Sequence, residues 1–302
     1  MKYITFLAKV DWANVLTLQN LCLQMNSSKY KSMCVCSSKH NFNYTIKHEY
    51  NLCSSSLPHP PILDHIIKSN IIIIACEEPP PNQLGWIKNN YPQIFNIIKK
   101  KKIIYFFCSD KYLYLYKNLQ ERNAFIVPEF KNYNNPIIIP GTPVEIPNTI
   151  YEILDERYKN NKIVVTHINS RRQDVMTKGS FWINKIMGDI VKNNKNIKYN
   201  FIDFQEKSFE EIMEIKKNTD IYIDQYNTIV GGFGTSSIEA LTYGCIILCT
   251  IGNLNENLFK IIDKVNFPII DITGDTCNLK KKISDICSLK KEDILDISKK
   301  NI

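Results

Sequence analysis

The sequence predicts an α/β protein with two domains, each built on a parallel β-sheet that helices cover on both faces. Short apolar runs alternate along the 302 residues with segments in which apolar residues recur at helical spacing. The connections between them are short, which is typical of parallel strands joined through helices. A proline-rich segment at 128–148 leaves little room for regular structure. We therefore expect domains at 1–145 and 146–302.

The first half opens with an apolar run at 3–8, which predicts a strand. The helix expected after it has apolar residues at helical spacing, namely Val15, Leu18, Cys22 and Met25. Further strands are expected at 32–36, 71–76, 103–108 and 124–127. Open α/β sheets bind ligands at the carboxyl ends of their strands, so the turn after the first strand, with Asp11 and Asn14, is a candidate site. Capping of the following helix is the alternative role for Asp11.

The second half shows the same alternation of strand and helix patterns. It begins with a strand at 162–166, and the next helix has its apolar positions at Trp182, Ile183, Ile186, Met187 and Ile190. A strand at 198–203 precedes a helix that ends near 216 and opens with a capping box formed by Ser208 and Glu211. The remaining segments are an apolar run at 220–224, a helix at 237–243, apolar runs at 245–250 and 268–272, and lysine-rich helical patterns to the end.

Three glycines, Gly231, Gly232 and Gly234, surround Phe233 between a strand and a helix. Glycine lets the backbone come close to a ligand, and the start of the helix offers unpaired N–H groups to an anion. The turn is therefore predicted to bind a phosphate. A dinucleotide fingerprint is the alternative, but Ser237 stands where its third glycine would be, and the next strand ends without an acidic residue for the ribose.

A second loop, between the strand at 162–166 and the next helix, carries Arg172 and Lys178. Gly179 leads from this loop into the helix. Two cations at the end of a strand suit a phosphate ligand. Because the glycine turn lies in the same half, we expect Arg172 and Lys178 to bind the same anion. Arg171 is an alternative to Arg172.

The composition, with 44% apolar and 23% charged residues, is that of a soluble globular protein. The formal net charge is +8, but lysine runs such as 99–102 are typical of solvated helix ends, so nucleic acid is not expected as a partner. No apolar run reaches transmembrane length, although peripheral contact with an anionic membrane stays open. The ten cysteines form no CxxC pair and lie mostly in apolar runs. We expect a reducing, cytoplasmic location and no metal site.

The glycine turn and the following helix resemble the signature of group 1 (family 4) glycosyltransferases. The segment reads GGFGTSSIEALTYGCII, and its matching positions are Gly232, Phe233, Gly234, Glu239, Ala240 and Gly244. The second loop is similar to the family's H-x-P-S-x-R…K-G loop at His167, Ser170, Arg172, Lys178 and Gly179. The turn with Asp11 is similar to its K/R-x-D-W-A-G loop.

The chain departs from the family pattern at Asn14 in place of glycine, at Asn169 and Ile246 in place of prolines, and at Gly231 in place of the first glutamate of an E-x7-E pair. A subset with D-x-x-x-D-Q upstream and no glutamate at that position is more similar, since this chain has Asp220 and Asp224. The missing glutamate bears on which donor sugar the chain would use more than on its resemblance to the family.

The resemblance implies the GT-B fold, with two Rossmann-like, doubly wound domains that face a cleft. Residues 1–145 would bind the acceptor, a glycan, lipid-linked or other hydroxyl compound, and 146–302 the nucleotide-diphosphate sugar donor. The implied reaction is a retaining, metal-independent transfer of a sugar in glycan biosynthesis, with no cofactor besides the donor substrate.

The resemblance also implies roles for single residues. Arg172 and Lys178 would bind the donor's diphosphate, and the N–H groups from Gly232 to Thr235 would stabilise the charge that develops on it. Glu239 would bind the ribose hydroxyls. The alternative for Glu239 is a capping box with Ser236.

Two other functions stay open at this point. One is a non-catalytic relative that binds a nucleotide or glycan, which Gly231 and Asn14 favour. The other is a GT-B sugar-nucleotide epimerase, which would need a set of catalytic acidic residues that the sequence does not reveal.

Overall fold

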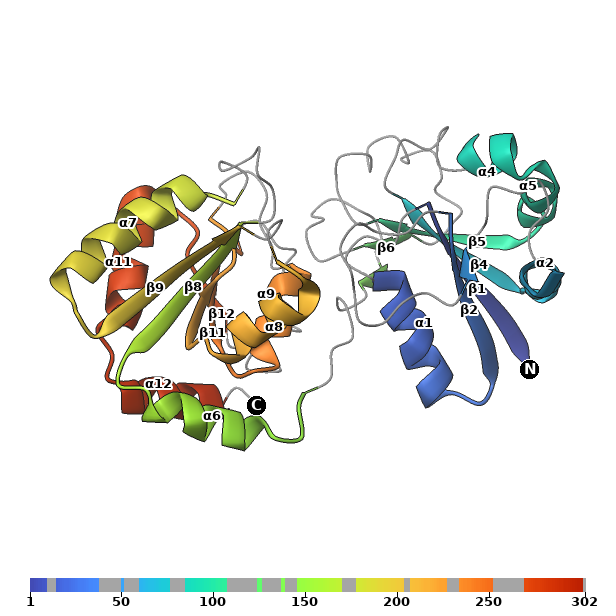
Figure 1. The fold of residues 1–302 in the computed structure, drawn as a ribbon. Helices are drawn as coiled ribbons and strands as arrows, with labels where there is room; N and C mark the ends of the chain where they lie inside the picture. Colours follow the sequence, from blue (N-terminus) through green and yellow to red (C-terminus); the bar gives the residue numbers. More distant parts are fainter. Residues whose placement is uncertain are drawn as a thin grey trace. The chain divides into compact units, whose positions relative to one another are not determined.

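Apolar runs in both halves of the chain form parallel strands in the computed structural model shown in Figure 1. The structure describes residues 1–9, 15–37, 50–51, 60–76, 85–107, 124–126, 137–138, 146–169, 178–203, 207–226, 234–251 and 269–300. The chain divides into two compact units, Met1–Pro143 and Val144–Ile302. Each unit has its own sheet and core, so the predicted two-domain α/β class is confirmed.

The sheet of the first unit has the order β3-β2-β1-β4-β5-β6-β7 within the described residues, and its strands are parallel. The strands are β1 (Lys2–Ala8), β2 (Tyr30–Cys36), β3 (Tyr50–Asn51), β4 (Ile71–Cys76), β5 (Lys102–Phe107), β6 (Ala124–Ile126) and β7 (Ile137–Ile138). The short strand β7 lies inside the proline-rich segment, for which we expected little regular structure. Residues 137 and 138 form a strand because their backbone pairs with β6.

Helices cover both faces of this sheet because alternate strand residues point to opposite sides (Figure 1). The helices are α1 (Val15–Asn26), α2 (Pro60–Lys68), α4 (Gly85–Asn90) and α5 (Pro92–Ile98). On β1, Phe6 packs in the cluster that contains Leu16 of α1. Leu7 packs in the opposite cluster with Ile66 of α2 and Ile94 of α5. The result is the doubly wound arrangement that the sequence predicts.

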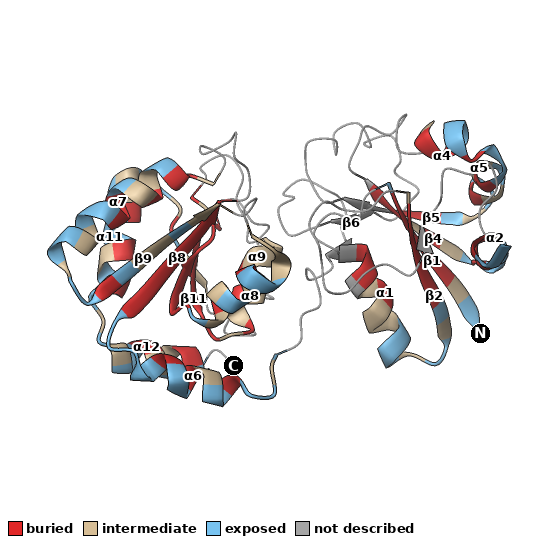
Figure 2. Cartoon of the chain, viewed as in Figure 1, coloured by how far each residue is buried: buried red, intermediate tan, exposed pale blue. Residues whose placement is uncertain are grey.

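In the second unit, the described strands form a parallel sheet with the order β12-β11-β10-β8-β9. They are β8 (Ile163–Asn169), β9 (Ile197–Asp203), β10 (Ile221–Ile223), β11 (Ile246–Cys249) and β12 (Ile269–Asp271). Strands β8, β10 and β11 are buried along their whole length, and Figure 2 shows β8 and β11 in red. Burial on both faces explains why these strands read as apolar runs in the sequence.

The helices of the second unit are α6 (Ile150–Lys159), α7 (Ser180–Asn193), α8 (Phe209–Lys217), α9 (Thr235–Leu241), α11 (Thr276–Cys287) and α12 (Lys291–Lys300). Helices α7 and α11 cover one face of the sheet and α8 and α9 the other (Figure 1). The predicted capping box of Ser208 and Glu211 is present at the start of α8, with both of its hydrogen bonds. Local sequence chemistry is therefore sufficient to start that helix.

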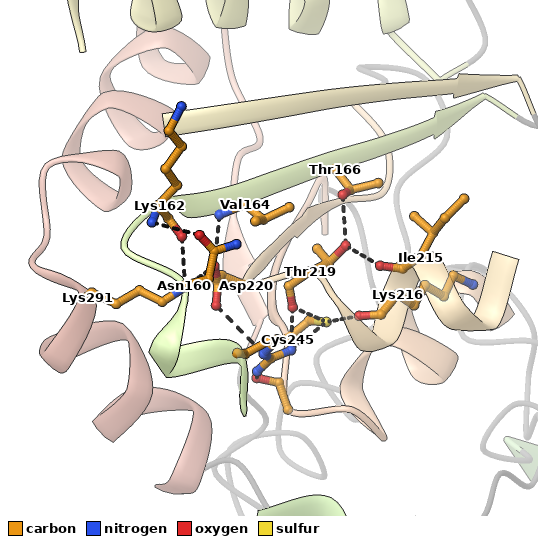
Figure 3. A network of polar contacts seen from close by, with 12 residues as sticks. Asn160, Lys162, Val164, Thr166, Ile215, Lys216, Thr219, Asp220, Cys245 and Lys291 are labelled. Carbon is orange, nitrogen blue, oxygen red and sulfur yellow. Dashed lines mark hydrogen bonds and ion pairs between the residues drawn. The ribbon is translucent and has the colours of Figure 1, made fainter. Parts of the chain in front are cut away.

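An ionic network joins α6 and α12 to the amino end of β10 (Figure 3). The carboxylate of Asp220 lies 3.7 Å from Nε of Arg157, and its Oδ2 accepts hydrogen bonds from Lys291 Nζ and from the backbone N–H of Val164. The side chains of Arg157 and Asp220 are only 6% and 4% exposed. Arg157 also donates to the backbone carbonyl of Thr219. Each charge in this buried network therefore depends on its partners.

We expect replacement of Asp220 by alanine to destabilise the second unit by about 3–5 kcal/mol, because it leaves the buried Arg157 guanidinium without its counterion. Denaturant unfolding followed by circular dichroism measures this loss. The matched control is Asp155→Ala, which removes an exposed carboxylate paired with Lys299. That variant should lose at most about 1 kcal/mol. Equal losses in the two variants would contradict a stabilising role for the network.

Candidate functional site

The strand order of the second unit identifies where a ligand can bind. Strand β8 pairs with its successor β9 on one side and with β10 on the other. The chain leaves the adjacent strands β8 and β10 toward opposite faces of the sheet, through α7 and α9 (Figure 1). In open α/β sheets, ligands bind at such a switch point, outside the carboxyl ends of the strands. The residues that follow β10 at this edge are Asp224, Gln225 and Tyr226.

Three segments meet at the carboxylate of Asp224. The ammonium of Lys178, from the loop before α7, donates to Oδ1 at 2.7 Å. The backbone N–H of Gly234 and the hydroxyl of Ser237, at the start of α9, donate to Oδ2 at 3.2 and 2.7 Å. The Asp224 side chain is 2% exposed and that of Lys178 is 15% exposed. Lys178 therefore lies between a buried anion and the protein surface.

The electrostatics of Asp224 favour its charged form. Burial alone would raise its pKa, but the positive charge of Lys178 and the hydrogen bonds from Lys178, Ser237 and Gly234 lower the pKa to about 2. The carboxylate is therefore ionised at neutral pH. An ammonium has three N–H donors, and the bond to Asp224 uses one of those that Lys178 carries. The others can be directed at an anion that approaches from the surface.

Backbone contacts hold the Lys178 loop against the segment after β10. The N–H of Tyr226 donates to the carbonyl of Lys178 at 2.9 Å. Gly179, the N-cap of α7, has φ +67°, and a Cβ at this position would lie 2.1 Å from the carbonyl oxygen of Tyr226. Only glycine fits this approach without a rearrangement. The glycine after Lys178 is therefore required by geometry at the site edge.

His167 supports the same edge from inside the core. Strand β8 runs to Asn169, three residues beyond the predicted end, so His167 lies in the strand and not in the loop. Its Nδ1 is 2.8 Å from the carbonyl oxygen of Ile223, and its Nε2 is 2.7 Å from the hydroxyl of Ser180. Because a carbonyl only accepts, Nδ1 carries the proton and Nε2 accepts from Ser180. Burial lowers the pKa of His167 to about 4, so the ring is neutral.

Glu239 lies in the second turn of α9 and faces α8. Its Oε2 accepts a hydrogen bond from Nζ of Lys216, whose side chain is 1% exposed and lies over the ring of Tyr222. The alternative role, a capping box with Ser236, is wrong, because α9 begins at Thr235 after Gly234. The Ser236 hydroxyl instead hydrogen-bonds that of Tyr222 at 2.6 Å. The ribose role of Glu239 stays a prediction.

The structure thus brings Lys178 and Gly234 together, as the sequence predicts, with Thr235 as the first residue of α9. Five further predicted site residues lie outside the described residues, namely Asp11, Asn14, Arg172, Gly232 and Phe233. Sequence reasoning gave no site role to Asp224, which binds both Lys178 and Gly234. The available signal was an acidic residue directly after a buried strand and before the glycine turn.

No group of three or more histidine, cysteine, aspartate or glutamate side chains in the described ranges is placed to hold a metal ion. None of the helices in the described part of the chain is both long and apolar enough to span a membrane.

Comparison with known proteins gives matches in structure only. No protein-family model and none of the curated proteins matches the sequence. Among solved structures, a putative UDP-N-acetylglucosamine 2-epimerase from Listeria monocytogenes matches with 10% identity and a TM-score of 0.50, over 99% of this chain and 90% of the other. A structure of S. aureus MnaA with UDP matches with 11% identity and a TM-score of 0.54, over 99% and 91%. The GT-B fold predicted from the sequence is confirmed by these matches.

We expect the stability of the second unit to fall between pH 7 and pH 5 because of His167. Its folded pKa of about 4 lies below the unfolded value of about 6.5, so the unfolded state binds the proton first. The stability that the neutral ring contributes is present above pH 6.5, declines as pH falls toward 4, and is fully lost below it. The loss between pH 7 and pH 5 should be about 2 kcal/mol.

The measurement is the free energy of unfolding as a function of pH for the natural chain and for His167→Gln, whose amide can replace both hydrogen bonds but does not titrate. The difference between the two curves isolates His167 from the other histidines. A difference that does not change with pH would contradict the buried neutral ring.

Proposed function

We propose that the chain is an enzyme of the GT-B fold that transfers a sugar from a nucleotide-diphosphate donor to a hydroxyl of a glycan or lipid-linked acceptor. The observation that carries the proposal is the position of Lys178. Its ammonium lies at the switch point of the second sheet and is held there by Asp224, which also binds Gly234, the last glycine of the predicted turn. In this proposal residues 146–302 bind the donor and 1–145 the acceptor, with Asp11 and Asn14 at the acceptor side.

The chemistry needs a cation at this position. The bond between the anomeric carbon and the β-phosphate oxygen breaks, and the acceptor oxygen bonds to the same carbon and loses its proton. The nucleoside diphosphate leaves with increased negative charge. Lys178, together with Arg172, stabilises this charge most strongly in the transition state, where it lowers the barrier. Overall retention at the anomeric carbon, without a metal ion, follows from the resemblance to family 4.

Glu239 is proposed to bind the ribose of the donor. Lys216 contacts one oxygen of its carboxylate and, being buried, holds the side chain in one orientation. The second oxygen can accept from a ribose hydroxyl. A fixed carboxylate loses little conformational entropy when the nucleotide binds.

A sugar-nucleotide epimerase is the second candidate. The two structural matches described above are a putative UDP-N-acetylglucosamine 2-epimerase and MnaA bound to UDP. Such an enzyme would use the same cationic site for the diphosphate but would need no acceptor. The donor side of the proposal is therefore common to both candidates.

Incubation of the purified chain with a panel of UDP-, GDP- and ADP-sugars distinguishes the candidates. Slow release of free sugar and nucleoside diphosphate supports a transferase, since water then replaces the acceptor. Formation of an isomeric nucleotide sugar supports an epimerase. Binding without turnover would favour a non-catalytic relative. If the chain shows no binding and no turnover with any of these sugars, the proposed donor site is refuted.

We expect Lys178→Met and Arg172→Ala each to weaken binding of the nucleoside diphosphate by roughly 1.5–3 kcal/mol, the usual contribution of a hydrogen bond to a charged group. Calorimetric titration with UDP, GDP and ADP measures this change. Lys195→Met is the control, because it removes the same charge from an exposed turn before β9. Equal affinity in Lys178→Met and in the control would contradict the proposed diphosphate contact.

A further inference from the structure

Asp224 presents an electrostatic problem for a diphosphate site. Its carboxylate is ionised, and it lies directly behind the ammonium that is proposed to bind a second anion. Two anions near one cation repel each other. A carboxylate at this position therefore needs a role that outweighs its repulsion of the ligand.

The contacts of Asp224 hold its carboxylate in position, so it is expected to stay there when a ligand binds. Its backbone N–H donates to the carbonyl of Leu248 at 3.0 Å, which fixes it at the end of β10. Its Oδ2 is bound by Gly234 and Ser237, and the side chain is almost completely buried. A diphosphate must therefore bind with the carboxylate in place, on the exposed side of Lys178.

The bond to Asp224 determines where the Lys178 ammonium lies. A lysine side chain has four rotatable bonds and loses much entropy when it is fixed. Here the loss occurs on folding, through the contact at 2.7 Å with a carboxylate that α9 also holds. The ammonium is thus already in place before the ligand arrives, which increases affinity.

We infer that Asp224 is a positioning residue, which holds the Lys178 ammonium and the Gly234 end of the glycine turn in the arrangement that receives the diphosphate. The inference rests on the proposed function only for the identity of the anion. It makes Asp224 favourable for anion binding in spite of its negative charge.

The variant that tests this inference is Asp224→Asn, since it removes the charge but keeps the size of the side chain. The amide oxygen can still accept from Gly234 and Ser237, but the amide NH2 then faces Lys178. Both groups are hydrogen-bond donors, so they cannot bind each other. We expect Lys178 to leave its position, and the affinity for inorganic pyrophosphate and for UDP to fall about tenfold. If the carboxylate only repels the ligand, the affinity should instead rise, which would overturn the inference.

Asp203→Asn is the matched control, because it removes the same charge from the carboxyl end of β9, which β8 separates from β10 in the sheet. Its affinity for pyrophosphate should stay equal or rise slightly. A double-mutant cycle completes the binding test. Once Lys178 is methionine, Asp224→Asn should no longer lower pyrophosphate affinity, because the positioned group is gone. An undiminished effect in that background would refute positioning of Lys178.

A test without ligand separates this inference from the proposed function. Amine labelling with quantification by mass spectrometry reports how accessible each lysine ammonium is. Labelling of Lys178 relative to the exposed Lys195 should increase severalfold in Asp224→Asn, with thermal melting showing that the variant is folded. Unchanged labelling would overturn the inference. If labelling increases but the natural chain binds neither pyrophosphate nor UDP, the proposed function fails and the positioning of Lys178 by Asp224 stands.

Discussion

The buried carboxylate of Asp224 is the contact on which the candidate site depends. It connects the end of β10 with the loop before α7 and with the start of α9, through Lys178, Gly234 and Ser237. An ionised carboxylate in the interior is stable only when hydrogen bonds and a counterion replace its lost hydration. The three donors meet this requirement, and by meeting it they bring three segments of the chain to one edge of the sheet.

Strand β10 has an aspartate at each end, and the two serve different purposes. Asp220, before the strand, lies between Arg157 of α6 and Lys291 of α12, so its negative charge is paired within the protein. Asp224, after the strand, is paired with Lys178, whose side chain reaches toward the surface. The first arrangement attaches helices to the amino edge of the sheet, while the second keeps a cation at the carboxyl edge, where ligands bind in such folds.

Features that depend on neighbouring residues could be predicted from the sequence, and those that depend on distant partners could not. Strand β4 at Ile71–Cys76 was predictable because buried parallel strands are continuous apolar runs, and the α8 capping box because its hydrogen bonds are local. The extension of β8 through His167 depends on pairing with β9 and β10, which lie far away in the sequence. The capping alternative for Ser236 is wrong because α9 begins after Gly234, and the Ser236 hydroxyl hydrogen-bonds Tyr222, fourteen residues earlier. The role of Asp224 required knowledge that three segments meet.

In the proposed function, the pairing of Lys178 with Asp224 also affects which anions bind. The chain has a formal net charge of +8, so attraction by charge alone would draw many anions to many lysines. An ammonium beside a buried carboxylate has little net charge at a distance. An anion therefore gains from it mainly by reaching its N–H donors in the orientation that Asp224 sets. In the proposed function, selection then depends on the direction of these donors, which a phosphate chain placed along the edge of the sheet can satisfy.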